Sequence, residues 1–578
     1  MQELKAGGLV LVIGALLFVA CSSDDPAPSE TVDEADVSLP QDDTLPPPLP
    51  TESTVEFLTP TQHLIRASMV LRGARPSLDD LTTVEADPEA LEPIVRSYVQ
   101  SAEFGASVRD LENETLLVRA ENFRLPGNGS LEGVQAQDVN VAMTETPLRT
   151  IEHIVMGGQP YTEIVRVNYQ VSNANAANVW EGLAAYDSSG PEWQPLEFTD
   201  DRPAAGILSD GTFWFRHRSA AINYHRGRAN EIARALLCSD FLSQDIVLDE
   251  PIDLSDPDAV ADAVVTNPAC VGCHQTLDPL ASFLWVIRQN WGAGSLNFPL
   301  SLYMPFNKDE WMVATGRPPG YFGMGGDTLA DLGQLIAADP RFSLCTAKRY
   351  YAYFAEVPVN AVPFEVASEL QQRLVESGFD IRELAVAIVT SDAFRVSHAT
   401  DAVTAEQLVG LKKARPAQLA RLFRGLTGLE WQTERSGDFG GMIDLMQNDF
   451  YGFRVLGGGI DSLFVTTPVH TMNTTTSLLL KGVANLAASK VAAEDLAQSD
   501  PAKRRLLTAL PNGQETDPIA VREQLEELHL ILYGSTADED VDATVSLFES
   551  LLAESGDAMR VWTMTLTAMF QDIRVAYF

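Results

Sequence analysis

Apolar side chains recur at the spacing of an amphipathic α-helix along much of the chain. Residues 61–73 show this pattern and end at Gly73, a residue type that commonly terminates helices. Further segments with helical patterns are 91–100, 417–428, 472–493, 521–533, 541–555 and 557–570. Residues 161–171 instead contain stretches with a period of two, which predict a strand. The pattern as a whole predicts a mainly α-helical, multidomain protein.

The first twenty residues have a different pattern. A single Lys at position 5 precedes an apolar run from Leu9 to Val19, which is too short to span a membrane and has the proportions of a signal peptide. The run leads into Phe18-Val19-Ala20-Cys21, which is similar to a bacterial lipobox. We therefore predict a lipoprotein signal peptide over 1–20 and lipidation of Cys21. The alternative is a secretory signal that is cleaved elsewhere.

An acidic, proline-rich segment follows Cys21. Residues 22–53 contain no Lys or Arg and many Asp, Glu and Pro, so they cannot bury a core and are predicted to form an extended tether over 21–55. Ser22 and Ser23, rather than Asp, follow the cysteine, which favours the outer membrane by similarity to lipoproteins in general. We therefore expect an outer-membrane lipoprotein that is periplasmic or surface-exposed.

The charge of the chain limits the classes of molecule that it is expected to bind. The formal net charge is −40 and the isoelectric point is about 4.4, which argues against binding of nucleic acid and against direct adsorption on anionic lipid. This charge suits simple solubility or docking of a basic partner protein. The 45% hydrophobic content is ordinary for globular protein, and the length after the tether suffices for about two to four domains.

The strongest chemical signal is Cys270-Val271-Gly272-Cys273-His274, which has the form of a c-type haem attachment motif. Two thiols at this spacing form thioethers to the haem vinyl groups, and the adjacent imidazole becomes the proximal iron ligand. With 5 cysteines and 8 histidines in 578 residues, about 0.0006 such motifs are expected by chance. The alternatives are a disulfide within the motif and a zinc site, but zinc normally takes four ligands from paired clusters. Export favours one covalent haem c, because bacteria attach it outside the cytoplasmic membrane.

The sequence also indicates which residues could orient the proximal histidine and which could be the second protein ligand of such an iron. Residues 270–277 are expected to form a helical turn closed by Asp278-Pro279, with a backbone carbonyl there accepting from the second ring nitrogen of His274. Three methionines follow at a suitable distance: Met304, Met312 and Met324. Met324 lies in the Gly-rich stretch 321–327 and is the predicted sixth ligand. The alternatives are an open sixth position, and methionines that serve only in packing.

One basic cluster precedes the motif. It comprises Arg216, Arg218, Arg226 and Arg228. Because guanidinium groups pair well with carboxylates, this cluster is a candidate clamp for the haem propionates; the alternative is ion pairing with the abundant Asp and Glu of the chain itself. His217 and His225 lie in the same segment and could reach the iron only if the fold brings them back.

Two further cysteines, Cys238 and Cys345, lie on either side of the motif. They could form a disulfide with each other, or they could be two buried free thiols. Cys238 ends Leu-Leu-Cys, Cys345 ends a stretch that begins Asp339-Pro340-Arg341-Phe342, and Asp-Pro-Leu follows the haem motif after three residues. These stretches resemble the multidomain cytochrome-c-like lipoproteins of planctomycetes and myxobacteria, which are built from adjoining domains of unknown function. The resemblance covers most of 57–400. It implies an exported, mainly helical protein with one c-haem, favours a Cys238–Cys345 disulfide, and implies no particular reaction.

Together these expectations define five segments. They are a signal peptide over 1–20, a tether over 21–55, an N-terminal mainly helical domain over 56–239, a cytochrome-c-like haem domain over 240–400 and a helical domain over 401–578. The preferred function is electron transfer to redox partner proteins through one haem, with no catalytic residue assigned. The alternatives are a haem enzyme with an open iron site, peroxidase-like or acting on polymers, and a surface scaffold with a structural haem.

Overall fold

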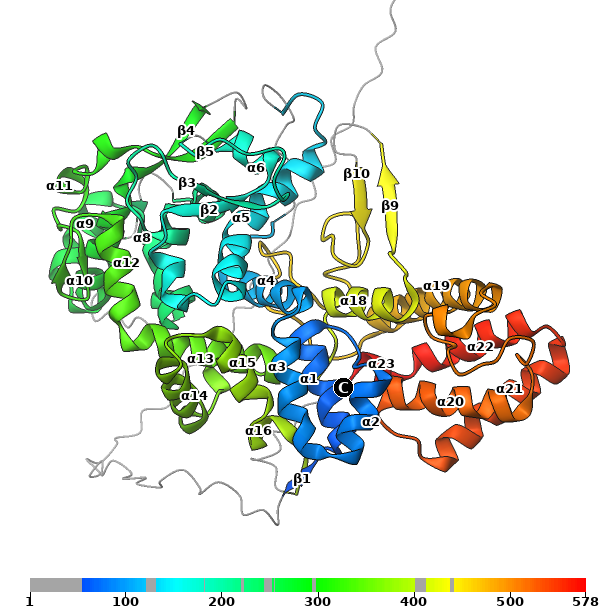
Figure 1. Ribbon diagram of the computed structural model, residues 1–578. Coiled ribbons are helices and arrows are strands. Elements are labelled where there is room, and N and C mark those ends of the chain that lie inside the picture. The colour runs from blue at the N-terminus through cyan, green and yellow to red at the C-terminus, as the bar shows by residue number, and fades with distance from the viewer. Residues whose placement is uncertain are drawn as a thin grey trace, which may run out of the picture. The chain divides into compact units, whose positions relative to one another are not determined.

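The computed structural model describes residues 55–120, 131–180, 182–219, 223–243, 252–253, 255–293, 298–400, 412–436 and 441–578. Contacts divide the chain into two units, residues 1–50 and 51–578, and every described residue belongs to the second. The described protein is mainly α-helical and multidomain, which confirms the predicted fold class (Figure 1). The predicted signal peptide, most of the tether and Cys21 lie outside the described residues.

Four helices begin the described chain. They are α1 (Pro60–Arg72), α2 (Leu78–Ala86), α3 (Leu91–Tyr98) and α4 (Ala102–Leu116). Thr59 and Gln62 form a capping box at the start of α1, and Gly73 ends it in the left-handed conformation (φ 66°), as the sequence pattern predicts. The preceding strand β1 (Val55–Phe57) pairs antiparallel with β8 (Val396–Ala399).

The next segment mixes helices with short strands. It contains α5 (Ala136–Met156), η5 (Tyr161–Val165), β2 (Tyr169–Ser172), α6 (Ala174–Val179) and β3 (Gln194–Glu197), and β2 pairs antiparallel with β3. The strand predicted over 161–171 is thus wrong in its first half. Tyr161 and Ile164 are buried on one side of a 3-10 helix, and Thr162 and Val165 on a second side, because residues three apart align in this helix.

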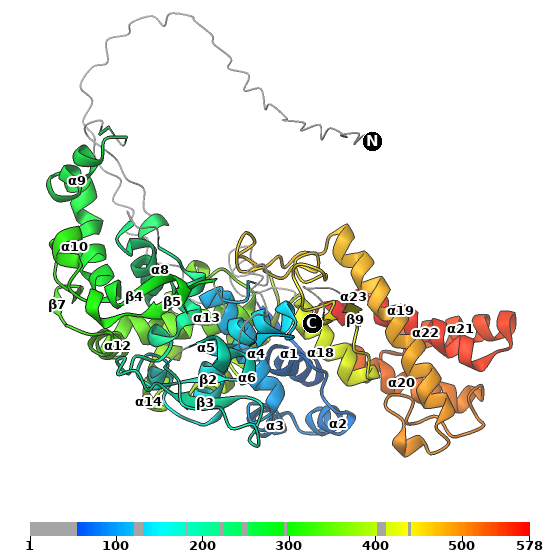
Figure 2. The same ribbon diagram turned by 90° about the horizontal axis from the view of Figure 1, so that it is seen from above.

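The middle of the chain carries the Cys-x-x-Cys-His motif. Its helices are η6 (Gly206–Ser209), α7 (Gly211–Arg216), α8 (Arg226–Leu237), η8 (Phe241–Ser243), α9 (Pro257–Thr266), α10 (Pro268–Ser282) and η9 (Phe283–Val286). They are followed by the pair β4 (Ile287–Ala293) and β5 (Phe298–Tyr303), then η11 (Pro305–Asn307), α11 (Trp311–Ala314) and the hairpin β6 (Gly320–Tyr321) and β7 (Met324–Gly325). Helix α10 contacts α8, α9 and β6, and α9 and α10 follow one another in Figure 2.

A helical group separates this segment from the C-terminal part. It consists of α12 (Leu329–Ala338), α13 (Pro340–Ala355), η12 (Val359–Ala361), α14 (Phe364–Glu376), α15 (Ile381–Val389) and α16 (Asp392–Arg395). Helices α13, α14 and α15 pack against one another (Figure 1).

The C-terminal part is helical apart from one hairpin. It contains α18 (Pro416–Thr427), β9 (Gln432–Arg435), β10 (Gly441–Asp444), α19 (Thr474–Ala497), η13 (Pro501–Lys503), α20 (Pro518–Tyr533), α21 (Asp538–Ser555), α22 (Ala558–Gln571) and α23 (Ile573–Ala576). Helix α19 packs mainly on α22, and a β-bridge joins Lys413 to Tyr577. No helix in the described ranges is long and apolar enough to cross a membrane.

One apolar core runs from α1 to α23 through buried side chains of all these segments. Contacts cross both predicted domain boundaries. Arg415 pairs with Glu356 (3.0 Å) and Glu114 (2.6 Å) across 400/401, and the following contacts cross 239/240. Strand β1 pairs with β8, and Arg66 of α1 donates to the carbonyl oxygens of Phe394 (3.0 Å) and Val396 (2.9 Å). The individual boundaries therefore stay predictions, whereas the core that surrounds α10 is continuous with the rest.

Candidate functional site

Helix α10 presents the motif residues on one face. Asn267 caps the helix by accepting from the backbone N–H of Ala269, and Pro268 occupies its first turn, where the missing N–H costs nothing. Cys270, Cys273 and His274 are spaced by three and four residues, so the three side chains share a face and all are half-buried. Neither cysteine is joined to another cysteine in a disulfide.

The helix is longer than the sequence indicates. A turn ending at Asp278-Pro279 is wrong, because α10 continues through Pro279 to Ser282. Proline removes one helical hydrogen bond. Packing offsets this loss: Leu277 and Leu280 are buried, and Pro279 lies against the β6–β7 hairpin, where a Cβ placed on Gly320 would be 3.2 Å from the Cβ of Pro279. The proline thus becomes the contact between α10 and the hairpin.

The imidazole of His274 is held by a carboxylate. Its Nδ1 lies 3.0 Å from Oδ1 of Asp278, one helical turn further along, and not at a backbone carbonyl as the sequence suggested. Asp278 is 1% exposed and also accepts from Arg226 of α8, from Nε at 2.7 Å and from Nη2 at 3.1 Å. The neighbour that fixes the ring is therefore fixed in turn by an arginine.

The charge of Asp278 follows from these partners. Burial would raise the pKa of this carboxyl, but the hydrogen bonds from His274 and Arg226 outweigh burial and hold the pKa below its usual value. An ionised Asp278 accepts the Nδ1–H of His274, which leaves Nε2 as the lone-pair donor of a neutral imidazole. This is the tautomer that a metal-ligating histidine needs.

Large apolar side chains are exposed on two elements beside α10: Val265 on α9, which contacts α10, and Met324 in the hairpin whose strand β6 contacts it. Others lie on segments close to α10 in the sequence: Leu242, Phe306, Met312 and Val313. Val313 is 95% exposed and Phe306 79%, values that are costly for large apolar groups in water. A haem is a large, mostly apolar plate, so two thiols and an oriented imidazole on one helix face, with exposed Val265 and Met324 on adjoining elements, fit it. No group of three or more His, Cys, Asp or Glu in the described ranges is arranged to hold a metal ion.

The structure places the three candidate methionines differently. Met324 lies on β7, half exposed, in the hairpin that contacts α10. Met304 accepts a hydrogen bond from Nδ2 of Asn307 at its sulfur (3.8 Å), and Met312 is exposed on α11. Met324 is thus the methionine whose own strand pair packs on the motif helix, and its role as sixth ligand stays a prediction.

The four clustered arginines serve the protein itself. Arg216 donates to the carbonyl oxygen of Ser462, Arg218 to that of Phe215 and Arg226 to Asp278. Arg228 is 1% exposed and donates to the carbonyl oxygens of His217 (2.9 Å) and Ile287. Of these contacts, the one between Arg226 and Asp278 is the ion pairing with an acidic residue that the sequence offered as the alternative, and the others are to backbone carbonyl oxygens.

Both histidines of that segment are held by protein contacts as well. Nε2 of His217 lies 2.8 Å from the carbonyl oxygen of Leu116, and burial lowers the pKa of this ring to about 4. His225 packs edge-on against Trp285 with ring centroids 4.8 Å apart, and burial lowers its pKa to about 3. These contacts fix both rings inside the protein.

Cys238 and Cys345 form a disulfide with S–S 2.06 Å, the pair that the resemblance favours. It joins the end of α8 to α13, across 107 residues of sequence. The sequence interpretation missed Arg226 and the carboxyl group of Asp278 as parts of the motif site. The position of Asp278 four residues after His274 was a usable signal, because side chains at this spacing meet on a helix.

Comparison with known proteins identifies one segment. A family described as a protein of unknown function (DUF1585) matches residues 323–394, from the turn of the β6–β7 hairpin to α16. No curated protein matches the chain, and no solved structure matches it. The match includes Met324 and Cys345 but begins after the Cys-x-x-Cys-His motif. It supports a composition that includes a domain of unknown function.

Proposed function

We propose that the protein is an exported, lipid-anchored c-type cytochrome that passes electrons through one covalently attached haem. One observation carries the proposal: Cys270, Cys273 and His274 share one face of α10, and the Nδ1 of His274 is fixed 3.0 Å from the buried Asp278. Chance does not explain the motif. A haem-binding histidine also requires a hydrogen-bond acceptor at the ring nitrogen that does not bind iron, and Asp278 provides it at Nδ1.

The residues of this chain would divide the work as follows. The thiols of Cys270 and Cys273 would hold the haem covalently through its two vinyl groups, and His274 would offer Nε2 to the iron. The bound haem supplies a one-electron couple. Asp278 sets the orientation of the imidazole, and Arg226 holds Asp278. Met324 is the proposed second protein ligand, which would leave no position for a substrate.

The partners and the location belong to the same proposal. A lipid on Cys21 and the acidic tether would hold the body at the outer membrane, on its periplasmic or outer face. The net charge of −40 favours a basic redox partner, because charge complementarity accelerates encounter. These elements rest on the sequence, since residues 1–54 lie outside the described part of the chain.

A second candidate, a haem enzyme with an open iron position, is favoured by the carboxylate behind His274. A carboxylate that accepts from the proximal histidine raises the basicity of this ligand and so increases electron donation to iron. In this case Met324 would stay on the surface, where it is half exposed.

The visible spectrum of the full chain, expressed in cells that mature c-type haems, tests both candidates. The electron carrier predicts a pyridine haemochrome of a haem with two thioether bonds, low-spin spectra in both oxidation states, and no response to cyanide or peroxide. High-spin spectra that change on adding either reagent would favour the enzyme. The matched variant Cys270→Ala/Cys273→Ala should carry no covalent haem. Absence of haem in the correctly matured wild-type protein would refute both candidates and leave a surface scaffold.

A further inference from the structure

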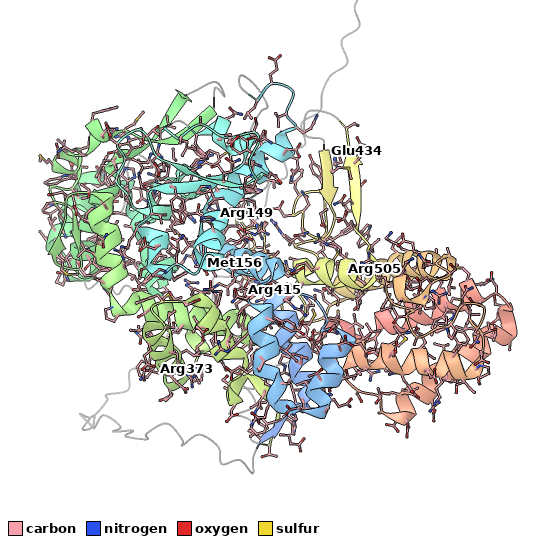
Figure 3. All side chains as sticks on the ribbon, viewed as in Figure 1. Arg149, Met156, Arg373, Arg415, Glu434 and Arg505 are labelled. Atoms are coloured by element: carbon pink, nitrogen blue, oxygen red, sulfur yellow. A yellow bond between two sulfur atoms is a disulfide. The ribbon has the colours of Figure 1, made fainter. Side chains whose placement is uncertain are left out.

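A large cavity lies away from α10, between α4 and α5 on one side and α18, β10 and the loop after β10 on the other. Its volume is about 920 Å³, within the range of small-molecule sites. Its walls bring together residues that are far apart in the sequence, near positions 110, 145, 420 and 445. Figure 3 labels Arg149, a residue of α5 in this wall, on the side of the helix toward the β9–β10 hairpin. We call this cavity the arginine pocket.

The composition of the arginine pocket departs from that of the chain. Its arginines are Arg109, Arg119, Arg149, Arg421, Arg424 and Arg454. Its carboxylates are Glu103, Asp110, Asp138, Glu145, Glu192 and Asp444. The whole chain has 40 basic residues against 80 acidic ones, so equal numbers in the pocket mean that its ratio of basic to acidic residues is twice that of the chain. An acidic ligand would meet less repulsion here than over a wall of average composition.

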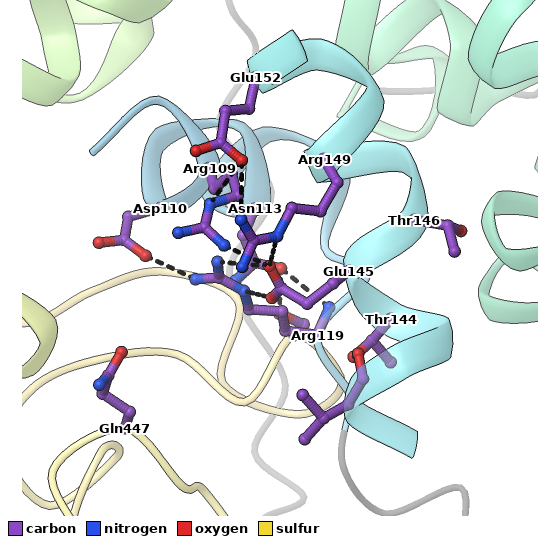
Figure 4. Close-up of polar contacts among 12 residues, drawn as sticks. Arg109, Asp110, Asn113, Arg119, Thr144, Glu145, Thr146, Arg149, Glu152 and Gln447 are labelled. Atoms are coloured by element: carbon purple, nitrogen blue, oxygen red, sulfur yellow. Dashed lines mark hydrogen bonds and ion pairs between the residues drawn. The ribbon is translucent and has the colours of Figure 1, made fainter. Parts of the chain in front are cut away.

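One wall is a network of buried ion pairs, drawn in Figure 4. Arg119 contacts both Asp110 (2.6 Å) and Glu145, and Arg421 reaches Asp110 at 2.7 Å. Burial would raise the pKa of Asp110, but Arg421 and Arg119 outweigh burial and hold the pKa far below its usual value. These carboxylates are therefore ionised and already neutralised by the protein.

The same network contains more guanidinium groups than carboxylates. Arg109 is 3.3 Å from both Glu145 and Glu152, and Arg149 is 3.1 Å from Glu152. Arg109, Arg119, Arg149 and Arg421 thus share Asp110, Glu145 and Glu152, which leaves one positive charge in excess. The Nε of Arg149 is buried without a hydrogen-bond acceptor. The wall is therefore short of acceptors, which a ligand could supply.

Arg424 supplies a further cation at the pocket. It lies on α18, three residues after Arg421, and its side chain is exposed. In the described part of the chain, its guanidinium has no ion-pair or hydrogen-bond partner. The guanidinium of Arg421, by contrast, donates hydrogen bonds to Asp110, to the carbonyl oxygen of Arg72 and to the hydroxyl of Ser107. A structural role in joining α18 to α4 explains Arg421 but not Arg424.

The remaining lining offers hydrogen bonds and an aromatic face. Five amide side chains line the pocket: Gln137, Asn173, Asn175, Gln447 and Asn448. Trp193 is half-buried, and the guanidinium of Arg149 lies over one face of its ring, with Cζ 4.8 Å from the ring centroid. Amides and guanidiniums bind hydroxyl groups, and an indole provides a flat apolar surface for the C–H face of a sugar ring. Guanidiniums also bind carboxylates and sulfates through paired hydrogen bonds.

We propose that the arginine pocket binds a short acidic oligosaccharide, with its acidic group on Arg424 and a sugar ring on Trp193. The hydroxyl groups meet the amides, and the shortage of acceptors around Arg149 is filled by ligand oxygens. This inference is independent of the haem, because no residue of α10 lines the pocket.

The test is calorimetric titration of the full chain at low salt with three trisaccharides: a trigalacturonate, a sulfated galactotriose and uncharged galactotriose. Both acidic probes should bind with Kd below about 1 mM and about tenfold more tightly than the uncharged probe. Arg424→Gln and Trp193→Ala should each weaken binding about tenfold, a loss typical of one hydrogen-bonded ion pair or one aromatic contact.

The matched control is Arg373→Gln, which removes an exposed arginine on α14, remote from the lining of the pocket (Figure 3). It should bind the acidic probes like the wild type. Arg424 is exposed and makes no described contact, so its replacement should leave the thermal unfolding midpoint unchanged. Three results would overturn the proposal: no binding of either acidic probe at 1 mM, equal binding of the uncharged probe, or equal affinities of Arg424→Gln and Arg373→Gln.

Discussion

The Nδ1 of His274 lies 3.0 Å from Oδ1 of Asp278, one turn further along the same helix. Because both residues sit on α10, the helix itself sets their separation, and no tertiary movement is needed to orient the ring. Arg226 approaches the same carboxylate from α8 at 2.7 Å. The imidazole, the carboxylate and the guanidinium thus form a row, in which hydrogen bonds from His274 and Arg226 together keep Asp278 ionised behind the proposed iron ligand.

Two substitutions in this row should move the midpoint potential of the haem-loaded protein in opposite directions. Asp278→Asn removes a negative charge and a strong acceptor, which should raise the potential, whereas Arg226→Gln removes the opposing positive charge and should lower it. Each change should reach about 59 mV, a tenfold change in a one-electron equilibrium. Spectroelectrochemical titration measures it, with Asp309→Asn on the surface as control. Shifts of the same sign would contradict this account.

The Cys238–Cys345 disulfide should stabilise the fold substantially. It closes a segment of 107 residues, and loop closure of this length predicts a loss of about 2–5 kcal/mol when the bond is removed. Reduction, or the Cys238→Ser/Cys345→Ser variant, should lower the urea midpoint of the transition that includes α8 and α13. The double variant should not respond to reductant. A wild-type midpoint that is insensitive to reductant under conditions that break the bond would refute the assignment.

Glu112 should make stability fall as the pH rises. Burial raises its pKa from 4.5 to about 6, although the hydroxyls of Tyr161 (2.7 Å) and Tyr350 (2.9 Å) donate to its carboxylate. The folded state binds this proton more tightly than the unfolded state. The contribution is therefore complete below pH 4.5 and is lost as the pH rises through about 6, at a cost of about 2 kcal/mol.

Glu112→Gln provides the comparison, because its amide keeps a neutral group at every pH. Urea unfolding of both proteins from pH 4 to 7.5 should show the variant gaining about 2 kcal/mol relative to the wild type. Asp210, whose pKa burial also raises to about 6, is present in both proteins and cancels in the difference. A difference that does not vary with pH would show that Glu112 is not the titrating group.

Lipidation at Cys21 should decide where the protein is found in the cell. Cys21→Ser should move the protein from the membrane fraction to the soluble fraction and abolish incorporation of a labelled fatty acid. The substitution leaves every described residue in place, so the thermal unfolding midpoint should not change. Labelled lipid on the serine variant, or a soluble wild-type protein, would exclude the proposed anchor.

Helical periodicity predicted much of the fold because it is a local signal. Residues 61–73 became α1 with its cap at Gly73, and 417–428 became α18. Residues 161–165 show the limit of this approach, since a 3-10 helix buries two sides of this short segment, whereas its alternation suggested a strand. Pro279 shows another limit, because packing against Gly320 outweighs the local signal to end the helix.

Only the local part of the motif site could be predicted, because short spacings are a local signal. The spacing of Cys270, Cys273 and His274 is short, so the sequence alone placed them together in one helical turn. Arg226 lies 52 residues before Asp278, and nothing in the sequence specifies that the two meet. The arginine pocket was beyond prediction, since Asp110 and Arg421 come from positions 311 residues apart.

The pairing of β1 with β8 has a mechanical consequence. A pull that arrives at Val55 from the N-terminal side is carried first by the three residues of β1 on their partner strand. The next contacts to bear load are the Leu58 N–H on the carbonyl oxygen of Arg395 and the Arg66 guanidinium on Phe394 and Val396. A force applied at residue 55 is therefore transmitted first to residues 394–399. None of these first contacts involves α10.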